Sequence, residues 1–134
     1  KKKYNEKFEV IVSMSCLEHI NDIEKNFKKL KYLTDKKHLQ YHVINFSSHI
    51  NKKNPFKNLY SEHPKNFRKK YKNNINFLRM SDYEKILKKN RYFYKFKTLS
   101  SYKIKKSEIH TYWKKYTINE LKVRTALLKI SGRY

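Results

Sequence analysis

The sequence contains six histidines and a single cysteine, side chains that commonly ligate metals or take part in nucleophilic catalysis. The histidines follow no recognised zinc-binding spacing, and no second cysteine can join Cys16 as a ligand. Cys16 and His19 share the start of one predicted helix, where thiol pKa values are lowered, but no third residue is identifiable that would orient the pair. We therefore identify no metal ligands and expect structural or solvated histidines. They are His19, His38, His42, His49, His63 and His110.

Phosphate-binding loops are excluded because Gly132 is the only glycine. P-loops and the usual dinucleotide fold need several glycines at fixed spacing. The three aspartates, Asp22, Asp35 and Asp82, form no Asp-x-Asp pair, so the sequence shows no two-carboxylate metal site. Gly132 follows an apolar run, where we expect the chain to turn through a positive φ.

The charge is strongly basic, with 34 Lys and Arg against 11 Asp and Glu and a formal net charge of +23. Such a balance is typical of proteins that bind polyanions, RNA first among them. The basic residues are nearly all lysine, however, and Lys, Asn, Ile, Tyr and Phe have A/T-rich codons. An A/T-rich genome would give this composition without selection for RNA binding. Both interpretations remain open on composition alone.

Two segments, 65–72 and 91–97, place aromatic side chains beside basic ones. That pattern supplies the parts of a base-stacking platform in a charged groove. The alternative is an element that buries its rings and exposes its lysines on the other side. The candidate nucleic-acid contacts are Arg68, Lys69, Arg91, Tyr92, Tyr94, Lys95 and Lys97.

The first third of the chain predicts a strand, a helix and a second strand. Residues 8–14 and 39–46 are short β-branched or apolar runs, and residues 17–33 carry apolar side chains at steps of three and four. Ser15 and Glu18 have the spacing of a capping box at the start of that helix. We therefore predict the α/β class, with a Rossmann-like strand–helix–strand start and a mixed or parallel sheet flanked by helices.

The remaining elements are less regular. We expect a short helix from Pro64, a strand over 75–80, a helix that begins at Ser81 and another that begins at Thr117. Residues 91–98 are ambiguous. No composition shift marks a domain boundary, so residues 1–134 are predicted to form a single α/β domain or an incomplete fragment of a larger one.

The C-terminal segment 119–134, which ends in Ser-Gly-Arg-Tyr, resembles a segment of glycosyltransferase-like proteins of bacteria and large DNA viruses. Residues 10–15 and 41–48 are similar to the opening strand–helix–strand of nucleotide-sugar domains of the GT-A type. The resemblance implies transfer of a glycosyl group from a nucleotide sugar, the donor and cofactor-like partner, to a glycan or other acceptor.

By this resemblance, Ser13 and Ser15 would lie near the nucleotide, with Glu120 and Arg124 on the helix beside it. Ser131, Gly132 and Arg133 would form the rim of the site, where Arg133 would pair with a phosphate. The Asp-x-Asp-like metal motif of many such enzymes is absent, so a divalent metal has no identified ligands. The catalytic residues, and whether the chain is an enzyme, stay open.

The alternative function is a structural RNA-binding protein, such as an organellar ribosomal protein from an A/T-rich genome that contacts ribosomal RNA. The two hypotheses place the protein in the cytoplasm or in the mitochondrial or plastid matrix, respectively. The sequence has no apolar run approaching the ~18 residues of a membrane span.

Overall fold

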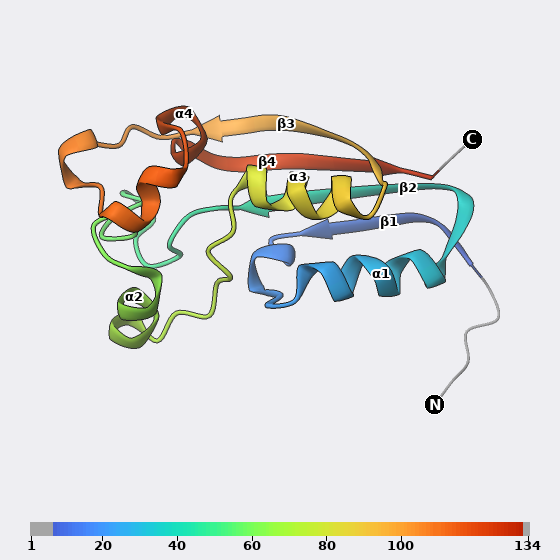
Figure 1. Ribbon diagram of the computed structural model, residues 1–134, viewed down its shortest axis with the longest axis horizontal. Helices are drawn as coiled ribbons and strands as arrows, with labels where there is room; N and C mark the ends of the chain where they lie inside the picture. The colour runs from blue at the N-terminus through green and yellow to red at the C-terminus, as the bar shows by residue number, and fades with distance from the viewer. Residues whose placement is uncertain (1–6, 133–134) are drawn as a thin grey trace.

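The computed structural model describes residues 7–132, which contain one four-stranded sheet in the order β1-β2-β4-β3 (Figure 1). Strand β1 (Phe8–Met14) is parallel to β2 (Thr34–Asn45). Strand β4 (Val123–Ser131) is antiparallel to both β2 and β3 (Phe93–Ser101). The predicted α/β class with a mixed sheet is confirmed.

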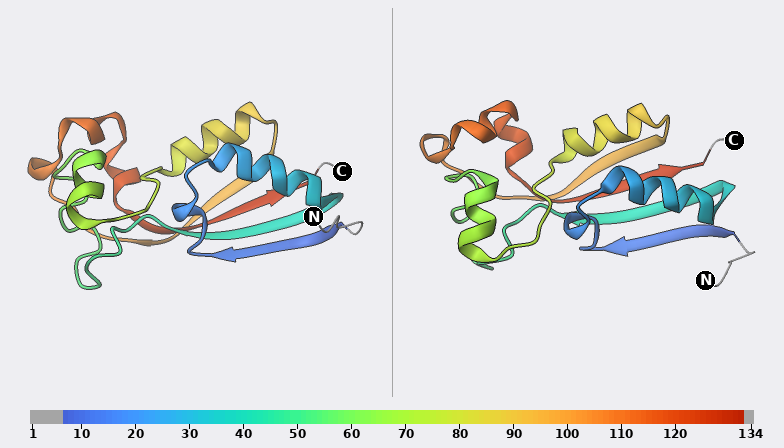
Figure 2. Two further views of the ribbon diagram at one scale, coloured as in Figure 1. Left: turned by 90° about the horizontal axis from the view of Figure 1, so that it is seen from below. Right: turned by 60° about the horizontal axis from the view of Figure 1, so that its bottom comes forward.

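Two helices, α1 (Ile23–Leu33) and α3 (Met80–Lys89), cover one face of this sheet (Figure 2). The main core lies between them and the strands, where Phe27 and Tyr83 from the helices meet Ile44 and Leu128 from the sheet. The alternation of buried and partly exposed residues along β2 and β4 reflects the two faces of the pleat.

The remaining helices lie beyond one end of the sheet (Figure 1). Here α2 (Pro64–Tyr71) and α4 (Ile118–Leu121) pack with irregular chain around the fully buried Trp113. Three short 3-10 helices complete the description of residues 7–132: η1 (Leu17–His19), η2 (Lys106–Glu108) and η3 (Thr111–Lys115).

The second face of the sheet carries exposed apolar side chains on its edge strand β1. Phe8, Val10, Val12 and Met14 all point to this face, with exposed fractions of 47, 54, 72 and 75%. Within residues 7–132 no helix covers it (Figure 2). The sheet is therefore flanked on one side only in the part of the chain described here.

The helix after β1 begins later than the sequence predicts. Ser15 does not cap a helix, because its backbone is left-handed, with φ 48°. Instead α1 begins at Ile23, and the carboxylate of Asp22 accepts a hydrogen bond from the Lys25 amide (2.9 Å). A single turn of 3-10 helix, η1, fills the interval.

Other boundaries also differ from the prediction. Residues 75–79 are irregular rather than a strand, and Phe77 has a left-handed φ of 61° that no strand accommodates. Helix α3 begins at Met80, one residue before the predicted start, and the Asp82 carboxylate accepts from the Arg79 amide (2.8 Å). The ambiguous segment 91–98 contributes most of β3.

Position 132 needs a glycine because there is no room for a side chain, and its φ is not positive. The predicted turn through a positive φ is therefore wrong. Its amide donates to the carbonyl of His38 (2.9 Å), which brings the end of β4 against the start of β2. A Cβ at this position would lie 2.9 Å from Nδ1 of His38 and closer still to the Lys36 carbonyl oxygen. Only a residue without a side chain fits where the end of β4 lies against the start of β2.

Candidate functional site at the carboxyl ends of β1 and β2

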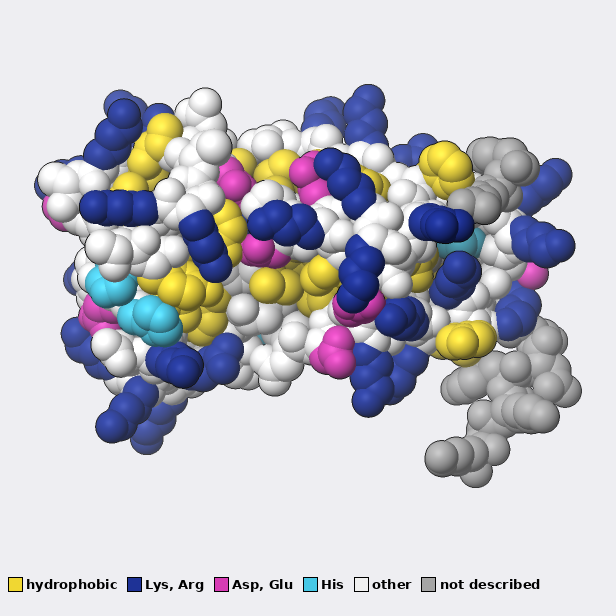
Figure 3. Space-filling view, in the orientation of Figure 1, with side chains coloured by type: hydrophobic (Ala, Val, Ile, Leu, Met, Phe, Trp, Pro, Cys, Tyr) yellow, Lys and Arg dark blue, Asp and Glu magenta, His cyan; other side chains and the backbone are white. Residues whose placement is uncertain are grey.

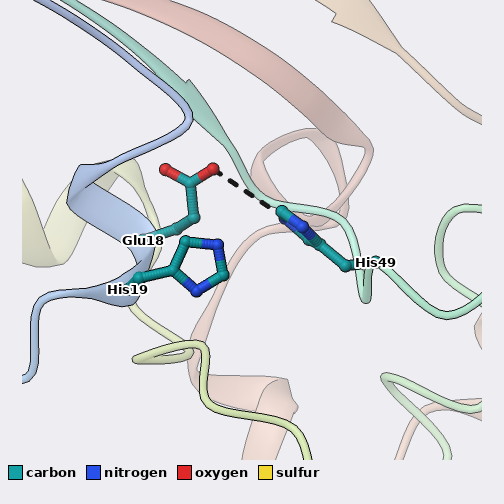
Figure 4. A group of neighbouring side chains, drawn as sticks. All are labelled: Glu18, His19 and His49. Atoms are coloured by element: carbon teal, nitrogen blue, oxygen red, sulfur yellow. Dashed lines mark ion pairs between the residues drawn. The ribbon is translucent and has the colours of Figure 1, made fainter.

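Glu18, His19 and His49 come together at the edge of the sheet where the parallel strands β1 and β2 end (Figure 4). Glu18 and His19 lie on η1, which follows β1, and His49 lies four residues beyond the end of β2 at Asn45. Open α/β sheets bind ligands outside the carboxyl ends of their parallel strands. This cluster therefore occupies the position in which a functional site is expected.

The turn that carries Glu18 and His19 is held in place by hydrogen bonds to its backbone. The amide of Ser15 donates to the Val43 carbonyl (2.9 Å), which ties the turn to β2. Asn76 holds the next residues: its side-chain amide donates to the Leu17 carbonyl (2.8 Å), and its backbone amide donates to the Glu18 carbonyl (2.7 Å). The backbone of η1 is thus positioned by two segments far apart in the sequence.

The turn that carries His49 is anchored in a similar way. The backbone amide of Ser48 donates to the Pro55 carbonyl (2.8 Å), and the side-chain amide of Asn73 donates to the Ser48 carbonyl (2.7 Å). His49 itself has a left-handed backbone, with φ 60°. This conformation is uncommon outside glycine, although His, Asn and Asp are enriched in it.

The side chains of the cluster converge on one another. Oε1 of Glu18 lies 3.8 Å from Nε2 of His49, and the rings of His19 and His49 meet edge to face with 5.1 Å between their centroids. One possible ligand atom from each residue lies within 4.8 Å of the other two. The imidazoles are accessible from solvent, whereas the Glu18 side chain is only 4% exposed.

The Glu18 carboxylate is buried, and neither of its oxygens has a hydrogen-bond partner among the described residues. Burial raises the pKa of Glu18, because the charged form loses its water. The nearby amides of Glu18 and Asn45, which fall short of hydrogen-bond geometry, and the two imidazoles lower this pKa, but burial outweighs them. A buried, unpaired carboxylate is unfavourable unless a cation or a donor group joins it.

The structure separates the predicted sugar-nucleotide residues between the two ends of the sheet. Ser13 and Ser15 lie at the carboxyl end of β1. Ser131 pairs with Leu39 near the other end of β2, and with Gly132 it lines a separate pocket of about 510 Å³. These residues therefore cannot surround one nucleotide as the resemblance implied.

Of these residues, Ser13, Arg124 and Glu120 have structural contacts. Ser13 Oγ shares a hydrogen bond with Nδ1 of His42 (2.7 Å) inside the sheet–helix interface. The Arg124 carbonyl accepts from the Phe46 amide, and the Glu120 carboxylate accepts from the Ser81 amide in the first turn of α3 (2.8 Å each). Arg133 lies outside the described residues.

Two aromatic rings of the predicted nucleic-acid platform pack inward. Tyr94 packs against the main core, and Tyr92, also packed there, donates its hydroxyl to the Phe27 carbonyl (2.9 Å), whereas Lys95 and Lys97 are exposed on the opposite side of β3. The rings are therefore used for packing, which is the alternative that the sequence left open.

The other basic candidates lie on two different segments. Arg68, which donates to the Ile75 carbonyl (3.0 Å), and the exposed Lys69 are on α2. The exposed Arg91 follows α3 with a left-handed φ of 56° and lines the same pocket as Tyr92. Basic side chains are spread over the whole face seen in Figure 3, with acidic side chains among them.

Comparison with known proteins identifies the fold. No family model and no curated protein matches the sequence. The structure is similar to two crystal structures of the plantazolicin methyltransferase BpumL, each in complex with a desmethylPZN analogue and SAH. The TM-scores are 0.53 and 0.52, at 15% and 14% sequence identity. The chain shares the fold of this methyltransferase.

Each match covers 99% of this chain but only 56% of the methyltransferase, so the chain spans little more than half the length of the protein it resembles.

These findings correct the functional predictions. The resemblance to nucleotide-sugar glycosyltransferases is wrong, because the chain as a whole matches a methyltransferase fold whose solved complexes hold SAH. The predicted nucleotide-sugar donor and glycan acceptor are wrong with it. The alternative, a ribosomal protein that contacts ribosomal RNA, has no support in these comparisons or in the placement of the aromatic rings.

The predictions of location are tested only with respect to membrane spans. Among residues 7–132, every helix is too short or too polar to cross a bilayer.

Sequence reasoning missed the grouping of Glu18 with His19 and His49. The histidines were compared with zinc spacings along the chain, whereas this cluster forms through the parallel pairing of β1 and β2. The usable signal was that Glu18 and His19 follow the first predicted strand and His49 follows the second. The carboxyl ends of neighbouring parallel strands lie at the same edge of a sheet.

Proposed function

We propose that this chain is part of a methyltransferase that uses S-adenosylmethionine as its methyl donor. The observation that carries the proposal is the structural likeness to BpumL, which extends over 99% of the chain. The presence of SAH in those complexes supports the choice of donor. The Glu18, His19 and His49 cluster supports it further, because it lies where α/β sheets bind their ligands.

The described residues do not by themselves fit a complete site for this cofactor. Nucleotide-type cofactors lie against glycine-rich turns that follow a parallel strand, where the absence of side chains allows close approach. The turn after β1 contains no glycine, and Gly132 is at the opposite end of the sheet against Lys36 and His38. We therefore assign no residue of this chain to the cofactor and derive no reaction step through it.

The experiment uses the protein expressed from its complete reading frame. Calorimetric titration with SAH tests cofactor binding, and transfer of a labelled methyl group from S-adenosylmethionine to a cell extract tests activity. We expect saturable SAH binding and a rise in melting temperature, since a ligand that binds only the folded state stabilises it. Homocysteine alone and adenosine alone serve as controls. A folded protein that neither binds SAH nor transfers methyl groups would overturn the proposal.

A further inference from the structure

We propose that Glu18, His19 and His49 form a binding site for a divalent transition-metal cation, with Zn²⁺ as the best fit. This inference goes beyond the proposed methyl transfer and does not depend on it, because the site is built from residues on this chain and metal binding is measured directly.

The types of the three side chains favour this class of cation. Two imidazoles and one carboxylate suit Zn²⁺ and its neighbours in the first transition row, whereas Mg²⁺ and Ca²⁺ prefer oxygen ligands alone. Three protein ligands leave a fourth tetrahedral position open to water or to a reactant, which is the arrangement of catalytic zinc sites.

The geometry is close to that of an occupied site. Ligands at about 2.0–2.1 Å from a tetrahedral zinc ion lie roughly 3.3 Å apart. The Glu18 Oε1 to His49 Nε2 distance is 3.8 Å, and the whole set of ligand atoms lies within 4.8 Å. The proposal requires the two solvent-accessible imidazoles to turn about their side-chain torsions to close this gap, while the backbones of η1 and Ser48 are anchored by their hydrogen bonds.

The state of Glu18 is the second, independent observation. Its residue is 3% exposed, and both carboxylate oxygens are without a hydrogen-bond partner among the described residues. Oε1 faces Nε2 of His49 at 3.8 Å (Figure 4). Acidic side chains are almost never fully buried unless they are paired or coordinate a metal. A cation between Glu18 and the histidines provides the missing partner.

The test measures metal binding to the protein in the absence of S-adenosylmethionine. Co²⁺ reports tetrahedral coordination through its visible absorption, and calorimetry gives the Zn²⁺ affinity. We expect one bound equivalent that Glu18→Gln and His49→Asn each weaken at least about 10-fold. Asn is chosen at position 49 because it tolerates the left-handed backbone found there.

The matched control is His110→Asn, which also removes one histidine. His110 lies outside the cluster and caps η3 through Nδ1, and Asn is itself a good N-cap residue. This variant should bind Zn²⁺ with unchanged affinity. If it weakens binding as much as His49→Asn does, the metal is held elsewhere.

Melting temperatures separate a metal site from a merely structural cluster. In the presence of a chelator, Glu18→Gln should melt no lower than the wild type, because it removes a buried carboxylate that has no hydrogen-bond partner among the described residues. Zn²⁺ should then raise the melting temperature of the wild type and not that of this variant. Absence of Co²⁺ absorption in the wild type, or Zn²⁺ affinity unchanged in both variants, would overturn the proposal. Since no methyl donor is present, these outcomes are independent of those for the proposed function.

Discussion

His42 is a histidine held in its neutral form inside the sheet–helix interface. It is 1% exposed, shares one hydrogen bond with Ser13 Oγ, and shares another with Oε1 of Gln40 (3.1 Å). Burial lowers the pKa of His42 to about 4, because the imidazolium would lose its water in this environment. Because this pKa differs between the folded and unfolded states, the protonation of His42 makes the free energy of unfolding depend on pH.

We predict that acid destabilises the protein through His42. In the unfolded chain its pKa is about 6.5, so the unfolded state takes up a proton first as the pH falls. The contribution of His42 to stability is complete above pH 6.5 and is lost between about pH 6.5 and 4, a total of about 3 kcal/mol.

Urea unfolding at pH 7 and pH 4.5 measures this change. His42→Gln should lose about 2 to 3 kcal/mol less than the wild type over that interval. Equal losses in the two proteins would contradict the prediction.

Individual roles of residues were hard to predict because each depends on a neighbour distant in sequence. Ser13 was expected near a nucleotide, but its partner is His42 on the adjacent strand. Glu120 was likewise expected beside a ligand and instead holds the start of α3. Composition and spacing predict which residue types are present, whereas the contacts depend on strand order and register.

At the scale of elements, α1 depends on Asp22 for its first turn. The carboxylate accepts the Lys25 amide, one of the donors that a helix N-terminus leaves without a partner inside the helix. Residue Ile23 follows directly and is buried against the sheet. This cap therefore decides where the helix begins and how it meets β1 and β2.

We predict that Asp22→Ala lowers the free energy of unfolding by about 1 kcal/mol, because a helix donor loses its partner. Asp22→Asn should retain most of the stability, since the amide oxygen accepts the same hydrogen bond. Thermal and urea unfolding at pH 7 measure both variants. A loss in Asp22→Asn as large as that in Asp22→Ala would show that the charge matters rather than the cap.

The strand–helix–strand start could be predicted because its hydrophobic periods are regular, over residues 8–14, 17–33 and 39–46. The segment 75–79 could not, because an apolar run of that length is compatible with a strand or with irregular chain. In the structure Asn76 donates a hydrogen bond to η1, and Ile75 and Phe77 are buried in the cluster around Trp113. The candidate site required the pairing of β1 with β2, which local pattern does not contain.

For the whole molecule, the uncovered face of the sheet is the feature with the largest effect on behaviour in solution. Four apolar side chains on the edge strand β1 are between 47 and 75% exposed. An exposed apolar edge strand is a site for association with other chains. The net charge of +23 opposes association at low salt, where its repulsion is not screened.

We predict that the chain of residues 1–134 self-associates as the salt concentration rises, and that Val12→Lys reduces this association. Val12 is in the middle of the exposed row, and a charge there hinders edge pairing. Sedimentation velocity at low salt and at about 0.15 M salt measures the effect, because the Debye length falls to about 8 Å at the higher salt and repulsion beyond that distance is largely screened. Thr98→Lys adds the same charge at an exposed position of β3 facing the other way. If both variants reduce association equally, net charge and not the β1 face is responsible.

The close approach of Gly132, at the end of β4, to the start of β2 has a consequence for the gene. Every first- or second-position base change in a glycine codon introduces a side chain or a stop, and the Lys36 carbonyl oxygen and the His38 ring leave no room for even a methyl group. Whatever mutational bias produced a lysine- and asparagine-rich chain with a single glycine, it could not change the first two positions of this codon without displacing the start of β2. The two guanines of codon 132 are thus maintained by the packing of two strands.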